Sequence, residues 1–118
     1  MPHVNRDEAA LFARDGYSVL DAEWEGFTVS YEAVATESDA TAVFAKLPQG
    51  ACMCPHWGYM LSGKATYKFS DREETYVAGD FFYLPPGHVP TQEAGTEWVT
   101  FSPTGPHQET QSVTRAQS

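Results

Sequence analysis

Basic residues are scarce in this chain. Seven Lys and Arg stand against sixteen Asp and Glu in 118 residues, which gives a formal net charge of −9. Proteins that bind nucleic acid displace counterions with clustered bases, and proteins that bind anionic lipid surfaces also depend on clustered Lys and Arg. The shortage of bases therefore predicts that neither nucleic acid nor a membrane is a partner.

Long apolar segments are missing as well. No apolar run approaches the roughly 20 residues that a membrane-spanning helix needs. The first 14 residues carry acids where a signal peptide has bases, and they contain no apolar core. We expect a cytoplasmic protein, and the length suits a single domain.

Cysteine is nearly absent, since only Cys52 and Cys54 occur, with one residue between them. Strand residues at this spacing lie near or beyond the Cα separation of about 6.8 Å that limits a disulfide. We therefore expect two free thiols, which fits a reducing compartment.

Aromatic residues, by contrast, are plentiful. Six Tyr, seven Phe and three Trp favour strands. Alternation with a period of two runs through residues 27–33, 41–47 and 64–70, and further strands are expected at 74–77, 81–84 and 96–101. Gly- and Pro-containing turns separate these segments. Many short strands at this spacing predict an all-β protein, an antiparallel sandwich or barrel.

The two ends of the chain have a different pattern. Asn5 is a good helix cap, Ala-rich residues follow, and Asp15-Gly16 is a stop signal, so the sequence predicts one short helix over residues 5–14. Residues 103–118 are rich in Thr, Gln, Ser and Pro and predict a flexible tail. The expected organisation is an N-terminal helical segment (1–16), a barrel (17–102) and a flexible C-terminal tail (103–118).

Two blocks of sequence resemble the signature motifs of the cupin superfamily. They are residues 50–63, GACMCPHWGYMLSG, and residues 79–88, GDFFYLPPGH. Gly79, Pro85 and Gly87 match the spacing of the second motif, and Gly63 matches the last glycine of the first. The resemblance covers about residues 50–90 and implies an antiparallel cupin jelly-roll β-barrel with an internal cavity. It also implies a homodimer, because small cupins often pair edge strands, and the aromatic strand at 27–35 is the expected edge.

The metal-binding positions of these motifs are altered. Cupin metal sites use two His and one Glu from the first motif and one His from the second. In this sequence those positions are Gly50, Cys52, His56 and Pro90. The resemblance therefore does not carry over the usual set of three His and one Glu, and the iron or manganese chemistry of that set is not implied directly.

A replacement set of metal ligands is present nearby. Cys52, Cys54 and His56 share one parity on a strand, so all three are expected to face the interior. His88 has the parity of Pro90 and follows the turn that delivers the last ligand in cupins. Two thiolates and two imidazoles suit zinc or copper better than magnesium or calcium, and iron is the further candidate that the resemblance suggests.

Structural roles explain the same residues equally well. Buried cysteines on a β-face usually behave as small hydrophobic residues, and His56 and His88 are equally consistent with hydrogen-bonded core residues. A Cys-x-Cys pair with one nearby His specifies a metal site only loosely. Most aromatic residues belong to the core, and those expected at the pocket are Trp57, Tyr59, Tyr67, Tyr83 and Trp98.

Three functions remain open. The first is an enzyme of the isomerase, lyase or oxygenase kind acting on a small organic molecule, with His56 as ligand or general base and His88 as ligand or proton shuttle. The second is a module without metal that binds or senses a small-molecule ligand. The third is redox sensing by Cys52 and Cys54, which requires accessible thiols of low pKa. His3 and His107 lie in the two ends and receive no role.

Overall fold

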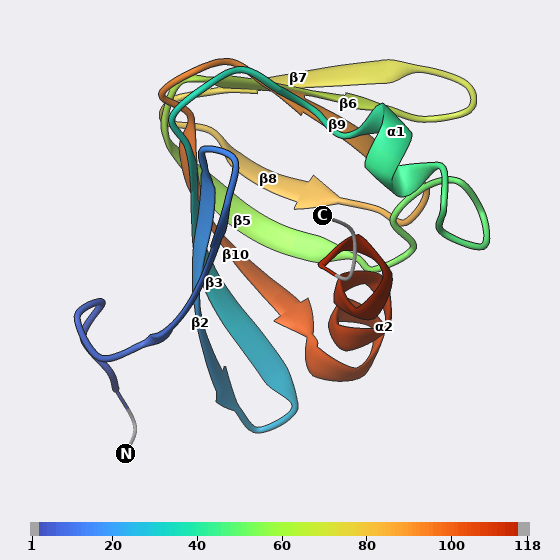
Figure 1. Cartoon of the computed structure of the whole chain (residues 1–118). Coiled ribbons are helices and arrows are strands. Elements are labelled where there is room, and N and C mark those ends of the chain that lie inside the picture. The colour runs from blue at the N-terminus through green and yellow to red at the C-terminus, as the bar shows by residue number, and fades with distance from the viewer. Residues whose placement is uncertain (1–2, 116–118) are drawn as a thin grey trace.

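The computed structural model describes residues 3–115, which form two antiparallel β-sheets packed face to face (Figure 1). The six-stranded sheet contains, in spatial order, β1 (Ala10–Arg14), β2 (Tyr17–Trp24), β3 (Phe27–Val34), β10 (Glu97–Pro103), β5 (His56–Ser62) and β8 (Phe81–Leu84). The four-stranded sheet contains β4 (Ser38–Asp39), β9 (Val89–Gln92), β6 (Lys64–Lys68) and β7 (Glu73–Val77). The helices are α1 (Thr41–Phe44) and α2 (Thr104–Thr114). The predicted all-β antiparallel architecture is confirmed.

The hydrophobic core lies between the sheets and is made by the inward-facing residues of both. Its buried members are Val34, Met60, Ala65, Tyr67, Phe82, Leu84 and Trp98. Because side chains alternate along a strand, each of these residues has neighbours that point out of the sandwich. The same alternation decides which polar residues reach the interior.

The hairpin between β5 and β6 depends on the motif glycine. Gly63 has a φ of +78°, and a Cβ there would lie 2.5 Å from the Cα of Thr96. Thr96 is fully buried, and its hydroxyl donates to the carbonyl oxygen of Glu93 at 2.7 Å. Only glycine fits this approach of two chain segments, so the position fixes how β5 passes to the opposite sheet.

The predicted N-terminal helix is wrong. The segment 5–9 makes only a turn, in which the Glu8 N–H donates to the Asn5 carbonyl at 2.9 Å, and residues 10–14 form strand β1, paired with β2. Asp15 and Gly16 have φ values of +51° and +86°. An Asp-Gly pair with positive φ at both residues closes a two-residue hairpin, so the expected helix stop is in fact the β1–β2 turn.

In the segment expected to be a flexible tail (103–118), the described residues contain helix α2 over 104–114; residues 116–118 lie outside the described part. Tertiary contacts hold this polar helix, because Arg14 donates to the Thr114 carbonyl at 2.9 Å and Arg115 pairs with Asp21 at 2.9 Å. In Figure 1 the helix lies beyond the ends of β5 and β10.

Two smaller expectations also fail. Residues 41–47 were predicted as a strand, but Asp39 accepts a hydrogen bond from the Thr41 backbone N–H at 2.9 Å and the chain turns into α1. The strand at 27–35 was expected at a sheet edge, but β3 lies between β2 and β10. Among residues 3–115, no helix is both long and apolar enough to cross a membrane.

Candidate functional site

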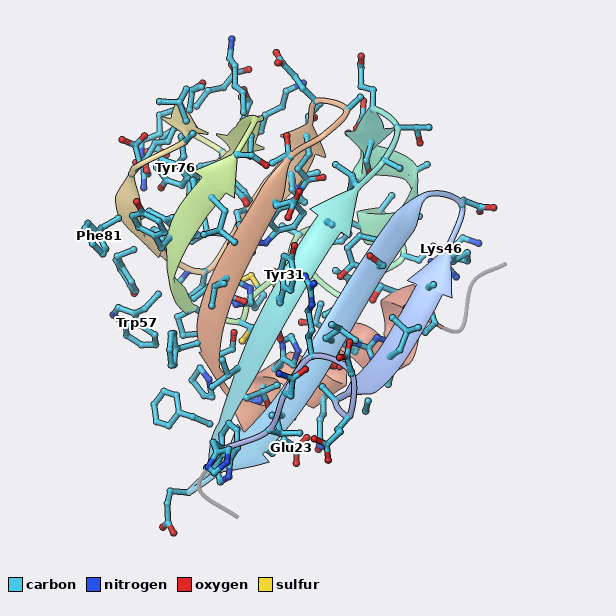
Figure 2. The ribbon with its side chains drawn as sticks, turned by 90° about the vertical axis from the view of Figure 1, so that its left-hand side faces the viewer. Glu23, Tyr31, Lys46, Trp57, Tyr76 and Phe81 are labelled. Atoms are coloured by element: carbon cyan, nitrogen blue, oxygen red, sulfur yellow. The ribbon has the colours of Figure 1, made fainter. Side chains whose placement is uncertain are left out.

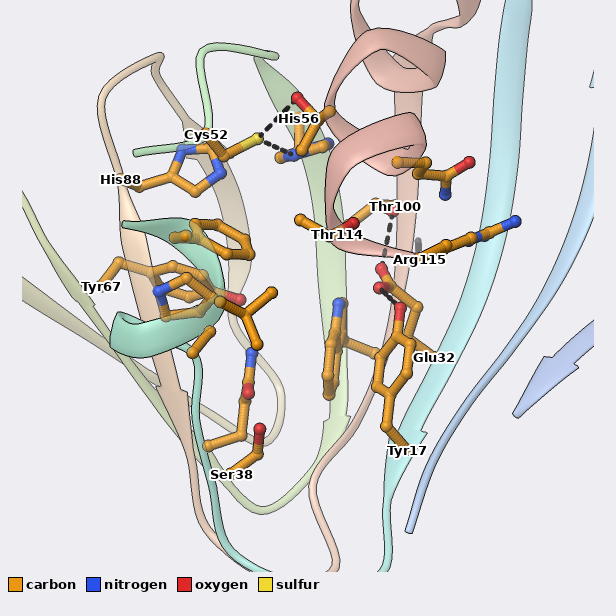
Figure 3. A pocket seen from close by; sticks show the side chains of 18 of the residues that line it. Tyr17, Glu32, Ser38, Cys52, His56, Tyr67, His88, Thr100, Thr114 and Arg115 are labelled. Carbon is orange, nitrogen blue, oxygen red and sulfur yellow. Dashed lines mark hydrogen bonds between the residues drawn. The ribbon is translucent and has the colours of Figure 1, made fainter. Parts of the chain in front are cut away.

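A cavity of about 280 Å³ lies between the two sheets and is closed on one side by α2. Its lining mixes aromatic and aliphatic side chains with many polar ones, and two gatherings of polar side chains stand out (Figure 3). One gathering holds Cys52, His56 and His88; the other holds Glu32 and Tyr17. One face of helix α2 completes the wall, through His107, Thr110, Gln111 and Thr114.

The two motif blocks meet at the first gathering. Cys52, in the loop before β5, forms an isolated bridge with His88, in which its N–H donates to the His88 carbonyl at 2.9 Å. His56 is the first residue of β5 and faces the same space. The Cys52 Sγ lies 3.7 Å from His56 Nε2, and the two imidazole centroids are 5.1 Å apart. One potential ligand atom from each of the three residues lies within 4.8 Å of the others.

Hydrogen bonds orient both imidazoles. His88 Nδ1 donates to the Pro85 carbonyl at 2.8 Å, which leaves the Nε2 lone pair free. His56 Nδ1 is 2.6 Å from the Ser102 hydroxyl, which leaves Nε2 toward Cys52. An imidazole fixed through one nitrogen presents the other as a metal ligand or a base.

Burial keeps these groups uncharged. It lowers the pKa of His88 from 6.5 to about 4 and holds the pKa of His56 well below its ordinary value, with the nearby His88 and His107 adding to the effect. Burial also raises the pKa of the Cys52 thiol, and it raises that of Cys54 to about 12. Redox sensing needs accessible thiols of low pKa. Both cysteines are free, as expected, but buried, so the geometry disfavours this role.

Cys54 is not part of the group formed by Cys52, His56 and His88. Its Sγ is 3.4 Å from the Pro55 carbonyl, and together with His56 and His107 it forms a second group whose ligand atoms lie within 4.8 Å of one another. His107 comes from α2 and is buried. The sequence analysis missed it because residues 103–118 were expected to be flexible.

The second polar gathering centres on Glu32 of β3. Its carboxylate accepts hydrogen bonds from the Tyr17 hydroxyl at 2.7 Å, from the Thr100 hydroxyl at 3.3 Å and from the Trp98 side chain. Burial raises the pKa of Glu32, and the neighbouring Asp21 raises it further. Sequence reasoning missed this residue, which shares its parity on β3 with Thr28, Ser30 and Val34, all buried in the structure.

The five aromatic residues expected at the pocket divide into two groups. Tyr67 and Trp98 line the cavity. Trp57, Tyr59 and Tyr83 do not line it: they belong to the outer face of the six-stranded sheet, and Trp57 and Tyr83 are 45% and 49% exposed. Figure 2 shows Trp57 on the outside of the sheet. Since His56 points inward, alternation along β5 sends Trp57 and Tyr59 outward.

Comparisons with known proteins identify the fold. No family model matches the chain, and no curated protein matches it. Among solved structures, an RmlC-like cupin from Shewanella frigidimarina matches at 15% identity and a TM-score of 0.58, covering 85% of this chain and 88% of that one. The polyketide cyclase RemF from Streptomyces resistomycificus matches at 15% identity and 0.59, covering 87% and 79%.

Parts of larger proteins have the same fold. The iron(II) form of HppE matches at 11% identity and a TM-score of 0.60, and this chain spans only 58% of its length; in apo-HppE the share is 56%. An oxalate decarboxylase from Lactobacillus farciminis matches at 12% identity and 0.62, and the chain spans 32% of it. At these identities the likeness concerns the fold alone.

Proposed function

We propose that this chain, a small cupin-type domain, holds a divalent transition-metal ion at Cys52, His56 and His88 and acts on a small organic molecule in the adjoining cavity. The observation that carries the proposal is the convergence of one thiol and two neutral imidazoles, within 4.8 Å of one another, on a cavity of about 280 Å³. A cavity with aromatic walls and convergent polar groups is typical of small-molecule sites.

The residues present fit such an ion. Ligands bound to zinc at about 2.0–2.3 Å in a tetrahedron lie about 3.5 Å from one another. The Cys52 Sγ and His56 Nε2 are already 3.7 Å apart. His88 is oriented by the Pro85 carbonyl, the arrangement that second-shell partners give to metal-ligating histidines. The sulfur donor favours zinc or copper over magnesium or calcium, and iron is a third candidate.

Each side chain has a role in this proposal. A bound ion of this kind supplies Lewis acidity beside the cavity. Three protein ligands leave a coordination position for a small molecule. Tyr67 and Trp98 provide flat apolar walls. Glu32, whose pKa burial raises, accepts or donates a proton on the wall that also carries Tyr17.

The site and the proteins that share the fold support a proposal for the class of reaction. Neighbours named as an oxalate decarboxylase and as a polyketide cyclase support chemistry on small organic molecules. We propose an isomerase, lyase or oxygenase of this general kind, in which the substrate reacts beside His56 and His88. Two buried free thiols also support a reducing, cytoplasmic location.

The test is a metal analysis of the full chain purified without a chelator or an affinity tag. We expect about one equivalent of zinc, copper or iron per chain at this position, and a loss of at least tenfold in zinc affinity in Cys52→Ser and in His88→Ala. Met53→Ser is the matched control, because Met53 lies beside Cys52 but is 49% exposed. Unchanged zinc affinity in both ligand variants would refute the site.

A binding or sensing module without metal is the second candidate. One observation favours it: over residues 3–115, every side-chain nitrogen and oxygen with no exposed surface of its own has a hydrogen-bond partner without any ion. In that case the cavity would hold an apolar or aromatic ligand as a carrier does. Binding of a small aromatic probe such as indole that persists at full affinity in excess EDTA would favour this candidate over the first.

A further inference from the structure

A second cluster of metal-ligating side chains lies outside the position proposed above. Cys54, His56 and His107 each offer a ligand atom, and these atoms lie within 4.8 Å of one another. The three residues come from separate parts of the chain: the loop before β5, the first position of β5 and helix α2. The imidazole centroids of His56 and His107 are 6.1 Å apart, with the rings nearly perpendicular.

His107 is an unusual residue for helix α2 to bury. The helix spans Thr104–Thr114, and His107 is the one residue in it that is buried, at 7% exposure. A helix that packs for stability alone buries aliphatic side chains along a stripe. Here the buried side chain is an imidazole, and Gln111 holds it through a contact of 2.5 Å between the two Nε2 atoms.

Cys54 faces the same place from the barrel. It is 1% exposed, and its Sγ lies 4.0 Å from the carbonyl of Pro103, the residue that precedes α2. A buried thiol needs no imidazole neighbours to pack well, because it behaves as a small hydrophobic group. Two imidazoles beside it complete three ligands of the kind that zinc prefers.

We propose that Cys54, His56 and His107 form a second position for a zinc-class ion, and that its occupancy fastens α2 over the cavity. The inference rests on the proposed function only through His56, and because one neutral imidazole offers one lone pair, the two positions are alternatives and are not filled at the same time. When an ion binds, the Cys54 thiol gives up its proton to solvent and its sulfur becomes a ligand. Three protein ligands again leave one coordination place for water or for a molecule in the cavity.

The link to α2 follows from how the helix is attached. At its beginning, the Thr104 and Thr28 hydroxyls are 2.9 Å apart, and at its end Arg14 donates to the Thr114 carbonyl. His107 lies between these attachments, on the side that lines the cavity. An ion held by His107, Cys54 and His56 would join the helix directly to β5 and its preceding loop, so the wall of the cavity would open less often.

The experiment measures hydrogen exchange of residues 104–114 in the metal-free full chain, with and without zinc. We expect zinc to slow exchange in the wild type by up to about 100-fold at a free concentration 100 times the dissociation constant, because opening that frees His107 breaks the site. Ser112→Ala, on the exposed side of α2, is the matched control and should respond like the wild type. In His107→Ala, zinc should no longer slow exchange in α2.

Further variants separate the two positions. Cys54→Ser removes a ligand without touching α2, so loss of the zinc effect there supports the inference even if His107→Ala folds poorly. His88→Ala should keep the zinc effect on α2, because His88 belongs only to the first position. Zinc binding that survives Cys52→Ser and His88→Ala unchanged, but not His107→Ala, would refute the first position and support the second. Equal slowing of α2 exchange in the wild type, Cys54→Ser and His107→Ala would overturn this inference.

Discussion

Protonation of His88 should contribute a defined part of the acid sensitivity of the metal-free protein. Burial lowers its pKa in the fold to about 4, against 6.5 in the unfolded chain. Above pH 6.5 the group is neutral in both states and has no effect on the pH dependence of folding. Between pH 6.5 and about 4 the unfolded chain takes up a proton that the folded one does not, so stability falls as the pH is lowered.

The size of this effect follows from the two pKa values. Each pKa unit corresponds to about 1.4 kcal/mol, so the shift of His88 removes about 3 kcal/mol of stability between neutral pH and pH 4. Such a loss is a large share of the 5–15 kcal/mol that is typical of folded domains at about 25 °C. His88 is 2% exposed, so solvent screening reduces this figure little.

The assay is urea unfolding at several pH values in excess EDTA, with wild type and His88→Asn compared. The asparagine amide is able to donate to the Pro85 carbonyl as His88 Nδ1 does, and it does not titrate. We expect the variant to be less stable at pH 7.5, because the smaller side chain leaves space, but to lose about 3 kcal/mol less than the wild type on going to pH 4. Parallel pH profiles for the two proteins would refute the reasoning.

Three other outcomes are expected. Gly58→Ala should destabilise the fold by about 3 kcal/mol in urea unfolding, because its Cβ would lie 2.5 Å from both the Phe82 ring and the Val99 carbonyl; a cost under about 1 kcal/mol would show that β5 moves freely there. Burial raises the pKa of Glu32 in the fold, so the wild type should lose stability as the pH rises above 4.5, and Glu32→Gln should not show this loss. The same slope of unfolding free energy against pH in both proteins would show that Glu32 is not the group responsible. The predicted homodimer should form through the outer aromatic face, where Phe81 is 86% exposed, so Phe81→Asp should give a monomer by light scattering, and an unchanged mass would exclude this face.

The sequence identified most strands because two signals agreed there. Around residues 64–84, alternation with a period of two and Gly-containing turns point to the same hairpins, and β6, β7 and β8 form where expected. At Asp15-Gly16 the signals conflicted, because the same dipeptide ends helices and closes hairpins. Helix α2 could not be predicted from its own residues, because the contacts that hold it involve Arg14 and Asp21. These residues lie nearly 100 positions away in the chain.

The candidate site could be predicted only in part from the sequence, for a related reason. Motif positions were enough to bring Cys52 and His88 together, because the two blocks pair directly. Glu32 escaped notice because β3 reverses the usual rule: Thr28 and Ser30 are buried, whereas Phe27 is 44% exposed. A strand that lines a polar cavity on one side and carries an aromatic face on the other gives an alternation whose inner side the sequence does not reveal.

The position of Trp98 gives the protein an optical reporter of its own. The indole is 4% exposed, lines the cavity and donates to Glu32. Its emission should therefore respond to any molecule that enters beside it and to ionisation of that carboxyl group. Trp57, on the opposite side of the sheet and 45% exposed, contributes a solvent-dominated background. With Trp24 and Trp57 replaced by Phe, the remaining tryptophan fluorescence comes from the cavity wall. Unlabelled compounds can then be screened for binding by the change in this emission.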